Sequence, residues 1–113
     1  DLIQCTWFYD ARDDIVEARS LEYFAARGYE TTGSPWYNLE NNWDWAQECA
    51  RSREATGKCL GMMYTSWTDN PNEDPWAGLP VSAAFAWNPD DPPALEMLPW
   101  SPAEHNRAWG VLP

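Results

Sequence analysis

Three aromatic and polar clusters recur along the 113-residue chain at nearly equal intervals. The tryptophans Trp7, Trp36 and Trp67 are separated by 29 and 31 residues, and each has a carboxylate or an amide close by in the sequence. Aromatic rings stack on the C–H faces of sugars, and carboxylates and amides offer directional partners to sugar hydroxyls. The pattern therefore predicts a carbohydrate-binding pocket, provided that the fold brings the clusters together. The neighbouring polar residues are Asp10, Asn38 and Asp69.

The spacing of the tryptophans matches the length of one strand–helix unit. Strand-like segments are expected near residues 2–8, 29–36 and 59–66, and each has one of the tryptophans at or next to its carboxyl end. Strands that alternate with helices predict an α/β fold with a parallel sheet and crossover helices. The carboxyl ends of parallel strands form the ligand site of such folds, so the clusters would meet at one edge.

Two helices are expected between these strands, near residues 13–27 and 39–53, and a short one over 79–87. Asn38 can cap the second helix, whose apolar face is predicted from Leu39, Trp43, Ala46 and Ala50. Gly28 and Gly57 suit the left-handed positions that end helices. A capping box at Ser101–Glu104 predicts a last short helix in the tail.

Four segments resemble a known enzyme family. The segment Gly33-Ser34-Pro35-Trp36-Tyr37-Asn38-Leu39 is similar to the seventh-strand signature of family 20 glycoside hydrolases, the β-N-acetylhexosaminidases. Residues 60–69 resemble the eighth strand of that family, and residues 3–7 resemble the sixth, which ends in Trp. Residues 24–29 look like the end of the family's sixth helix and its Gly-Tyr turn. The resemblance covers residues 1–87.

The resemblance implies that the chain is the C-terminal part of a TIM (βα)8 barrel. Residues 1–89 would form its last three βα units, and residues 90–113 an acidic, Pro-rich tail. A complete barrel needs about 250 residues. The chain also begins in what reads as the middle of a strand, so we expect the rest of the barrel to precede residue 1.

The resemblance also assigns roles by position. Tyr37 would hold the acetamido carbonyl of the substrate, and Trp7, Trp36 and Trp67 would wall the pocket around the sugar and its N-acetyl methyl group. Asp69 stands where the family has a Glu that binds a sugar hydroxyl, and is one methylene shorter. Asp10 is a further candidate for sugar hydroxyls, although it could equally cap the helix that follows.

The catalytic acid of the family is not found in this chain. Family 20 enzymes carry an Asp-Glu pair at the end of the fourth strand, and no predicted strand here ends in Asp-Glu. Two functions remain open: part of a catalytic barrel for N-acetylhexosamine-containing glycans, or a non-catalytic carbohydrate-binding or structural module. A third interpretation is another barrel glycosidase with Asp10 or Asp69 as a catalytic residue.

Charge and composition exclude several other classes. Eighteen acidic residues against seven basic ones give a net charge of −11, whereas nucleic acids and anionic membranes bind basic surfaces. No apolar run approaches the roughly 18 residues of a membrane helix. One histidine, His105, rules out a multi-histidine metal site, and no cofactor is expected. Cys5, Cys49 and Cys59 have no metal-binding spacing and are interpreted as buried free thiols.

Overall fold

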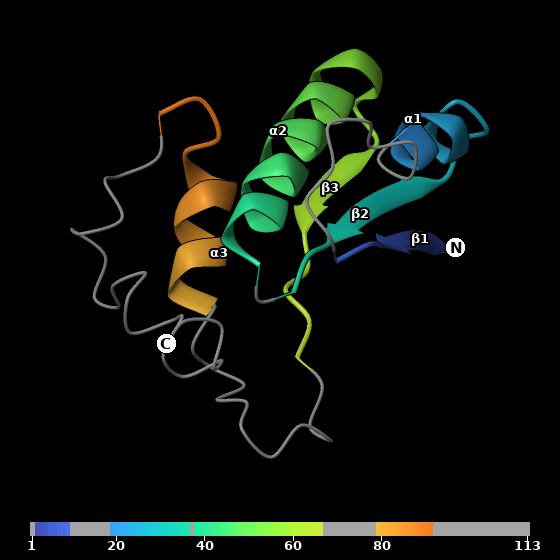
Figure 1. Ribbon diagram of the computed structural model, residues 1–113. Helices are drawn as coiled ribbons and strands as arrows, with labels where there is room; N and C mark the ends of the chain where they lie inside the picture. Colours follow the sequence, from blue (N-terminus) through green and yellow to red (C-terminus); the bar gives the residue numbers. More distant parts are fainter. Residues whose placement is uncertain (1, 10–18, 37, 67–78, 92–113) are drawn as a thin grey trace, which may run out of the picture.

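A computed structural model describes residues 2–9, 19–36, 38–66 and 79–91 of the chain (Figure 1). Strands and helices alternate throughout this part, as the repeat of tryptophans predicts. The elements in order are β1 (Ile3–Trp7), α1 (Arg19–Ala25), β2 (Glu30–Ser34), α2 (Leu39–Thr56), β3 (Cys59–Met62) and α3 (Leu79–Trp87).

The strands form one parallel sheet in the order β1-β2-β3. Trp7 of β1 lies opposite Ser34 of β2, and Gly33 of β2 lies opposite Met62 of β3, after a register irregularity between β2 and β3. The predicted α/β class and the parallel pairing are therefore confirmed. Among the described residues the sheet is open, with β1 and β3 at its edges, and no closed barrel is formed.

The helices α1 and α2 cover the same face of the sheet (Figure 1). The close approach of α2 depends on Gly33, because a Cβ atom there would lie 2.5 Å from Trp45 Cε3. Two apolar clusters form the core, one between the helices and the sheet and one between α2 and α3, and Met62 packs against both. The first consists of Leu21, Trp45, Cys49 and Cys59, and the second of Ala46, Val81 and Phe85.

The predicted helix ends agree well with the structure. Asn38 caps α2, since its side-chain oxygen accepts a hydrogen bond from the backbone N–H of Asn41 at 3.1 Å. Gly57 ends α2 with φ 66°, and Gly28 follows α1 with φ 90°. The helix expected over residues 39–53 continues to Thr56.

Other expectations need correction or lie outside the described residues. Trp43 does pack on Phe85, with ring centroids 5.3 Å apart, but the tryptophan that α2 fully buries is Trp45. The described helix within residues 13–27 is Arg19–Ala25. The capping box at residues 101–104 and nearly all of the tail from residue 90 onward lie outside the described ranges.

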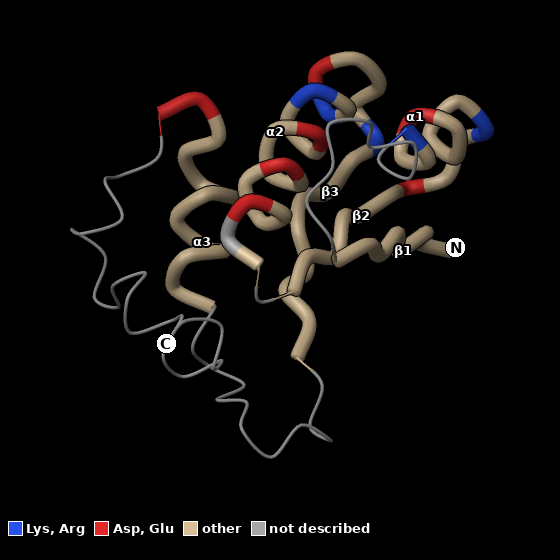
Figure 2. Tube along the Cα trace, in the orientation of Figure 1, with Lys and Arg blue, Asp and Glu red and all other residues tan. Residues whose placement is uncertain are grey.

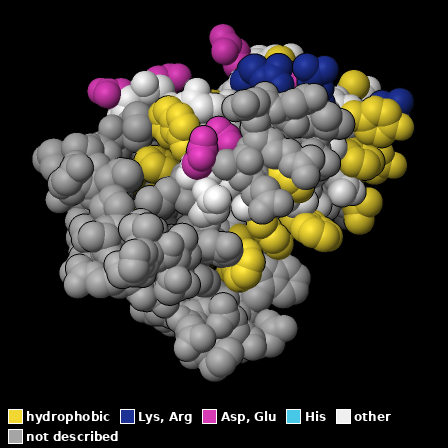
Figure 3. Space-filling view, viewed as in Figure 1, with side chains coloured by type: hydrophobic (Ala, Val, Ile, Leu, Met, Phe, Trp, Pro, Cys, Tyr) yellow, Lys and Arg dark blue, Asp and Glu magenta, His cyan; other side chains and the backbone are white. Residues whose placement is uncertain are grey.

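The face of the sheet away from the helices carries exposed apolar side chains (Figure 3). Thr6 faces α1, because its hydroxyl oxygen accepts a hydrogen bond from Ser20 at 2.8 Å. Side chains alternate along a strand, so Ile3 and Trp7 point to the opposite face, where they are 52% and 65% exposed. Leu60 of β3 is also half exposed, while its neighbour Cys59 is buried beneath α2.

Most of the described charged residues lie on the helices (Figure 2). The described Lys and Arg residues gather around α1 and the carboxyl-terminal half of α2, where Arg51 forms ion pairs with Glu22 and Glu48. These pairs are solvent-exposed and contribute little to stability. Within the three described strands, by contrast, Glu30 is the only charged residue.

Candidate functional site

Aromatic rings meet at the carboxyl ends of β1 and β2. Trp7 and Tyr9 stack with ring centroids 5.6 Å apart, and Tyr9 meets Trp36 edge to face at 5.4 Å. Trp7 remains 65% exposed, and Trp36 is half-buried. We call Trp7, Tyr9 and Trp36 the aromatic cluster. It unites two of the three predicted tryptophans and places an accessible indole face at the predicted ligand-binding edge.

Tyr9 links the two tryptophans, and its role was not predicted from the sequence. The signal was present, because residues two apart on an extended segment share a face. Position 9 therefore lies on the same side as Trp7, while Phe8 points the other way and packs against the core cluster of Leu21 and Trp45.

The end of β1 is held in place by α2. The Phe8 carbonyl accepts two hydrogen bonds, one from Trp45 Nε1 at 3.0 Å and one from Asn41 Nδ2 at 2.8 Å. These bonds fix the backbone between Trp7 and Tyr9, and the buried Phe8 ring sets which way the two flanking rings face. The exposed part of the cluster is thus positioned by buried contacts behind it.

The end of β2 is held by the same helix. Asn42 Nδ2 donates to the Trp36 carbonyl and, at 2.8 Å, to the Asn38 carbonyl. Asn42 is only 1% exposed, so these amide contacts belong to the interior. The side chain of Asn38 caps α2. The amide that was predicted to lie beside the sugar pocket therefore has a structural role.

The chain after β3 stays aligned with the end of β2. The Met63 N–H donates to the Gly33 carbonyl at 2.8 Å, and the Thr65 N–H and hydroxyl both donate to the Pro35 carbonyl, at 2.9 and 2.8 Å. The third strand end therefore runs to the same edge of the sheet as the second. The remaining predicted site residues, Asp10, Tyr37, Trp67 and Asp69, lie outside the described residues.

The cluster offers stacking surfaces and no acid for bond cleavage. Within the described ranges no strand is followed directly by Asp or Glu. The same ranges contain no group of three His, Cys, Asp or Glu side chains that could hold a metal ion. A search of the described helices finds none long and apolar enough to cross a membrane.

Comparisons with known proteins return no relative. No protein-family model matches the chain, and neither a curated protein nor a solved structure does. The resemblance to family 20 glycoside hydrolases thus rests on the sequence motifs alone.

Proposed function

We propose that this chain supplies the aromatic walls of a sugar subsite in a glycoside hydrolase barrel that acts on N-acetylhexosamine-containing glycans. The observation that carries the proposal is the aromatic cluster at the carboxyl ends of β1 and β2. This edge of a parallel α/β sheet is where ligands bind.

The geometry of the cluster suits a pyranose ring. The Trp7 indole is largely exposed and is backed by Tyr9, so a sugar can cover its free face without displacing another ring. The edge-to-face contact of Tyr9 with Trp36 makes a corner, with an interplanar angle of 61°. A flat wall joined to a corner can receive both the C–H face of the sugar and a projecting methyl group such as that of an N-acetyl substituent.

The topology supports the barrel part of the proposal. The strands follow one another in the order β1-β2-β3, and α1 and α2 lie on one face. Doubly wound sheets place helices on both faces, whereas a barrel keeps all of them outside. The opposite face exposes Ile3 and Leu60, which further strands of the barrel would cover. Within the described sheet β1 is an edge strand, and its outer side would pair with the preceding strand of the barrel.

The remaining roles stay predictions. Tyr37 would bind the acetamido oxygen, and Asp10, Trp67 and Asp69 would complete the pocket, while the catalytic acid would come from another part of the barrel. A non-catalytic carbohydrate-binding module is the alternative, favoured by the lack of a strand-end Asp-Glu pair in the sequence.

Sugar binding by the 113-residue chain tests the proposal. We expect tri-N-acetylchitotriose to receive saturation transfer from the protein at its N-acetyl methyl and ring protons. Trp7→Ala should weaken binding about two- to tenfold, since an aromatic contact contributes about 0.5–1.5 kcal/mol. Trp87→Ala is the matched control, because Trp87 is 85% exposed on α3 and is not part of the aromatic cluster.

Circular dichroism of each variant shows whether the fold is kept. A folded chain that gives no saturation transfer, or a Trp7→Ala variant that binds as well as the parent, would contradict the proposal.

A further inference from the structure

Two buried thiols that the proposed function does not use converge on one carbonyl group. Cys49 of α2 and Cys59 of β3 are 4% and 2% exposed and belong to the same core cluster. Cys49 Sγ lies 3.3 Å from the Gly61 carbonyl oxygen, and Cys59 Sγ lies 3.9 Å from the same atom. The two sulfur atoms are therefore neighbours across the helix–sheet interface.

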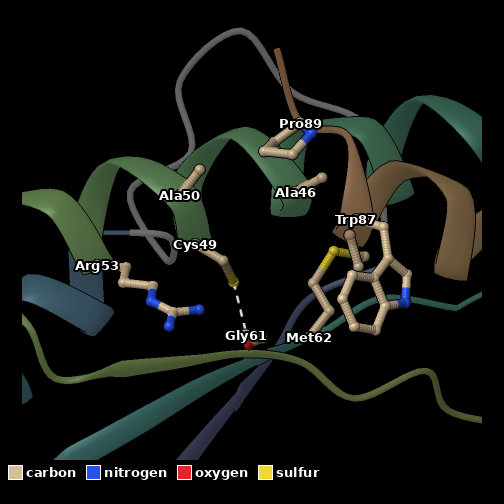
Figure 4. A pocket seen from close by; sticks show the side chains of 9 residues that line it. Ala46, Cys49, Ala50, Arg53, Gly61, Met62, Trp87 and Pro89 are labelled. Atoms are coloured by element: carbon tan, nitrogen blue, oxygen red, sulfur yellow. Dashed lines mark hydrogen bonds between the residues drawn. The ribbon is translucent and has the colours of Figure 1, made fainter. Parts of the chain in front are cut away.

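A cavity of about 280 Å³ between α2, β3 and α3 leads to one of these thiols. Cys49 lines it, with its sulfur turned toward Gly61 at the floor (Figure 4). Cys59 is not part of the lining. A small molecule that enters between Ala46, Ala50 and Trp87 thus meets the Cys49 sulfur first.

The surroundings favour one thiolate in the pair. The Cys49 thiol hydrogen-bonds to the Cys59 sulfur and lowers the pKa of Cys59 to about 6, with the positive charge of Arg53 acting in the same direction. The same contact, together with burial, raises the pKa of Cys49. Because the two thiols interact this closely, their ionisations belong to the pair, in which Cys59 holds the thiolate and can accept the Cys49 proton.

We propose that Cys49 and Cys59 form a hydroperoxide-reactive dithiol that closes to a disulfide between α2 and β3. The Cys49 sulfur passes its proton to the Cys59 thiolate as it attacks one peroxide oxygen, so that an S–O bond forms, the O–O bond breaks and hydroxide leaves, taking a proton to become water. The Cys59 sulfur then attacks the Cys49 sulfenic acid, forming the S–S bond and releasing a second water. Two thiols and one hydrogen peroxide thus become one disulfide and two waters.

Cys5 provides an internal contrast. It lies in β1 on the sheet face away from the helices, and its sulfur is hydrogen-bonded to the Ser34 hydroxyl at 2.7 Å. The thiol of Cys5 is therefore next to a hydroxyl group, whereas the thiols of Cys49 and Cys59 are next to each other. Oxidation of Cys5 is expected to stop at the sulfenic acid or to form links between chains.

The test oxidises the folded 113-residue chain with one equivalent of hydrogen peroxide at pH 7. Remaining thiols are then alkylated in denaturant, and peptides are mapped by mass spectrometry. We expect a Cys49–Cys59 link, with Cys5 alkylated, and formation about tenfold faster in the folded chain than in urea. The Cys5→Ser variant should behave like the parent.

Two single variants separate the steps. In Cys59→Ser, Cys49 should stop at a sulfenic acid that dimedone traps, and in Cys49→Ser no intramolecular link should form. A link that involves Cys5, or a Cys49–Cys59 link that forms no faster in the folded chain than in urea, would overturn the proposal. Sugar binding is measured in a separate assay. A negative result for the disulfide therefore does not contradict the proposed sugar subsite.

Discussion

Substitution of Gly33 by alanine should destabilise the fold more than any other change of one methyl group in β2. An added Cβ would lie 2.5 Å from Trp45 Cε3 and 2.8 Å from Cys49 Sγ, closer than real Cβ atoms approach their neighbours. Trp45 cannot easily withdraw, because it is 1% exposed and its Nε1 donates to the Phe8 carbonyl. Either α2 shifts away from the sheet, or this hydrogen bond is lost.

The magnitude follows from two opposing effects. Overpacking of a well-packed core costs about 1–3 kcal/mol, and so close an approach to a rigid indole places Gly33→Ala near the upper limit. Replacing a glycine inside a strand by alanine raises the free energy of unfolding by about 0.5–1 kcal/mol, because the unfolded chain has less conformational freedom to lose. We therefore expect the free energy of unfolding to fall by about 2 kcal/mol.

Urea unfolding followed by far-UV circular dichroism measures the change. Glu30→Ala, at an exposed position of the same strand, is the control and should stay within about 0.5 kcal/mol of the parent. The double variant Gly33→Ala/Trp45→Phe should lose less than the sum of the two single variants, because the smaller ring makes room for the methyl group. An unchanged or higher stability of Gly33→Ala would refute the close-packing argument.

Two further predictions concern catalysis. The 113-residue chain should not hydrolyse an aryl N-acetyl-β-glucosaminide, because no predicted strand ends in Asp-Glu; clear turnover by the purified chain would instead promote Asp10 or Asp69 to catalytic residues. In the complete barrel that we propose, Tyr37→Phe should lower kcat for an N-acetylated sugar about 10²–10³-fold, the usual loss when one donor to a developing negative charge is removed. The melting temperature should change little, and an unchanged kcat with a lowered melting temperature would reject this role for Tyr37.

The elements that the sequence predicts correctly are those with local signals. The spacing of Trp7 and Trp36 reflects one full strand–helix unit, and the structure confirms a parallel pair of strands, in which β1 ends at Trp7 and β2 ends at Ser34, two residues before Trp36. Asn38 and Gly57 mark the two ends of α2 because a side-chain cap and a left-handed glycine are requirements of the helix itself. Such features need no knowledge of what packs against the helix.

The inner face of α2 was not predictable in the same way. Hydrophobic periodicity favoured Trp43, yet the helix buries Trp45 together with the amides of Asn41 and Asn42. Polar side chains on an inner face look like solvent-exposed positions until their partners are known. The Asn41 amide donates to the Phe8 carbonyl, which is far away in the sequence. The Asn42 amide donates to the Trp36 carbonyl, which is close in the sequence.

These same contacts make α2 the element on which both proposed sites depend. Its first turns bind the carbonyl groups that orient the aromatic cluster, and its later turns carry Cys49 above the sheet. Gly33 lies beneath both Trp45 and Cys49, so a displacement of α2 there disturbs both sites at once. We therefore expect Gly33→Ala to weaken sugar binding and to slow disulfide formation, even where most chains remain folded. A loss in only one of them would show that the two halves of α2 move independently.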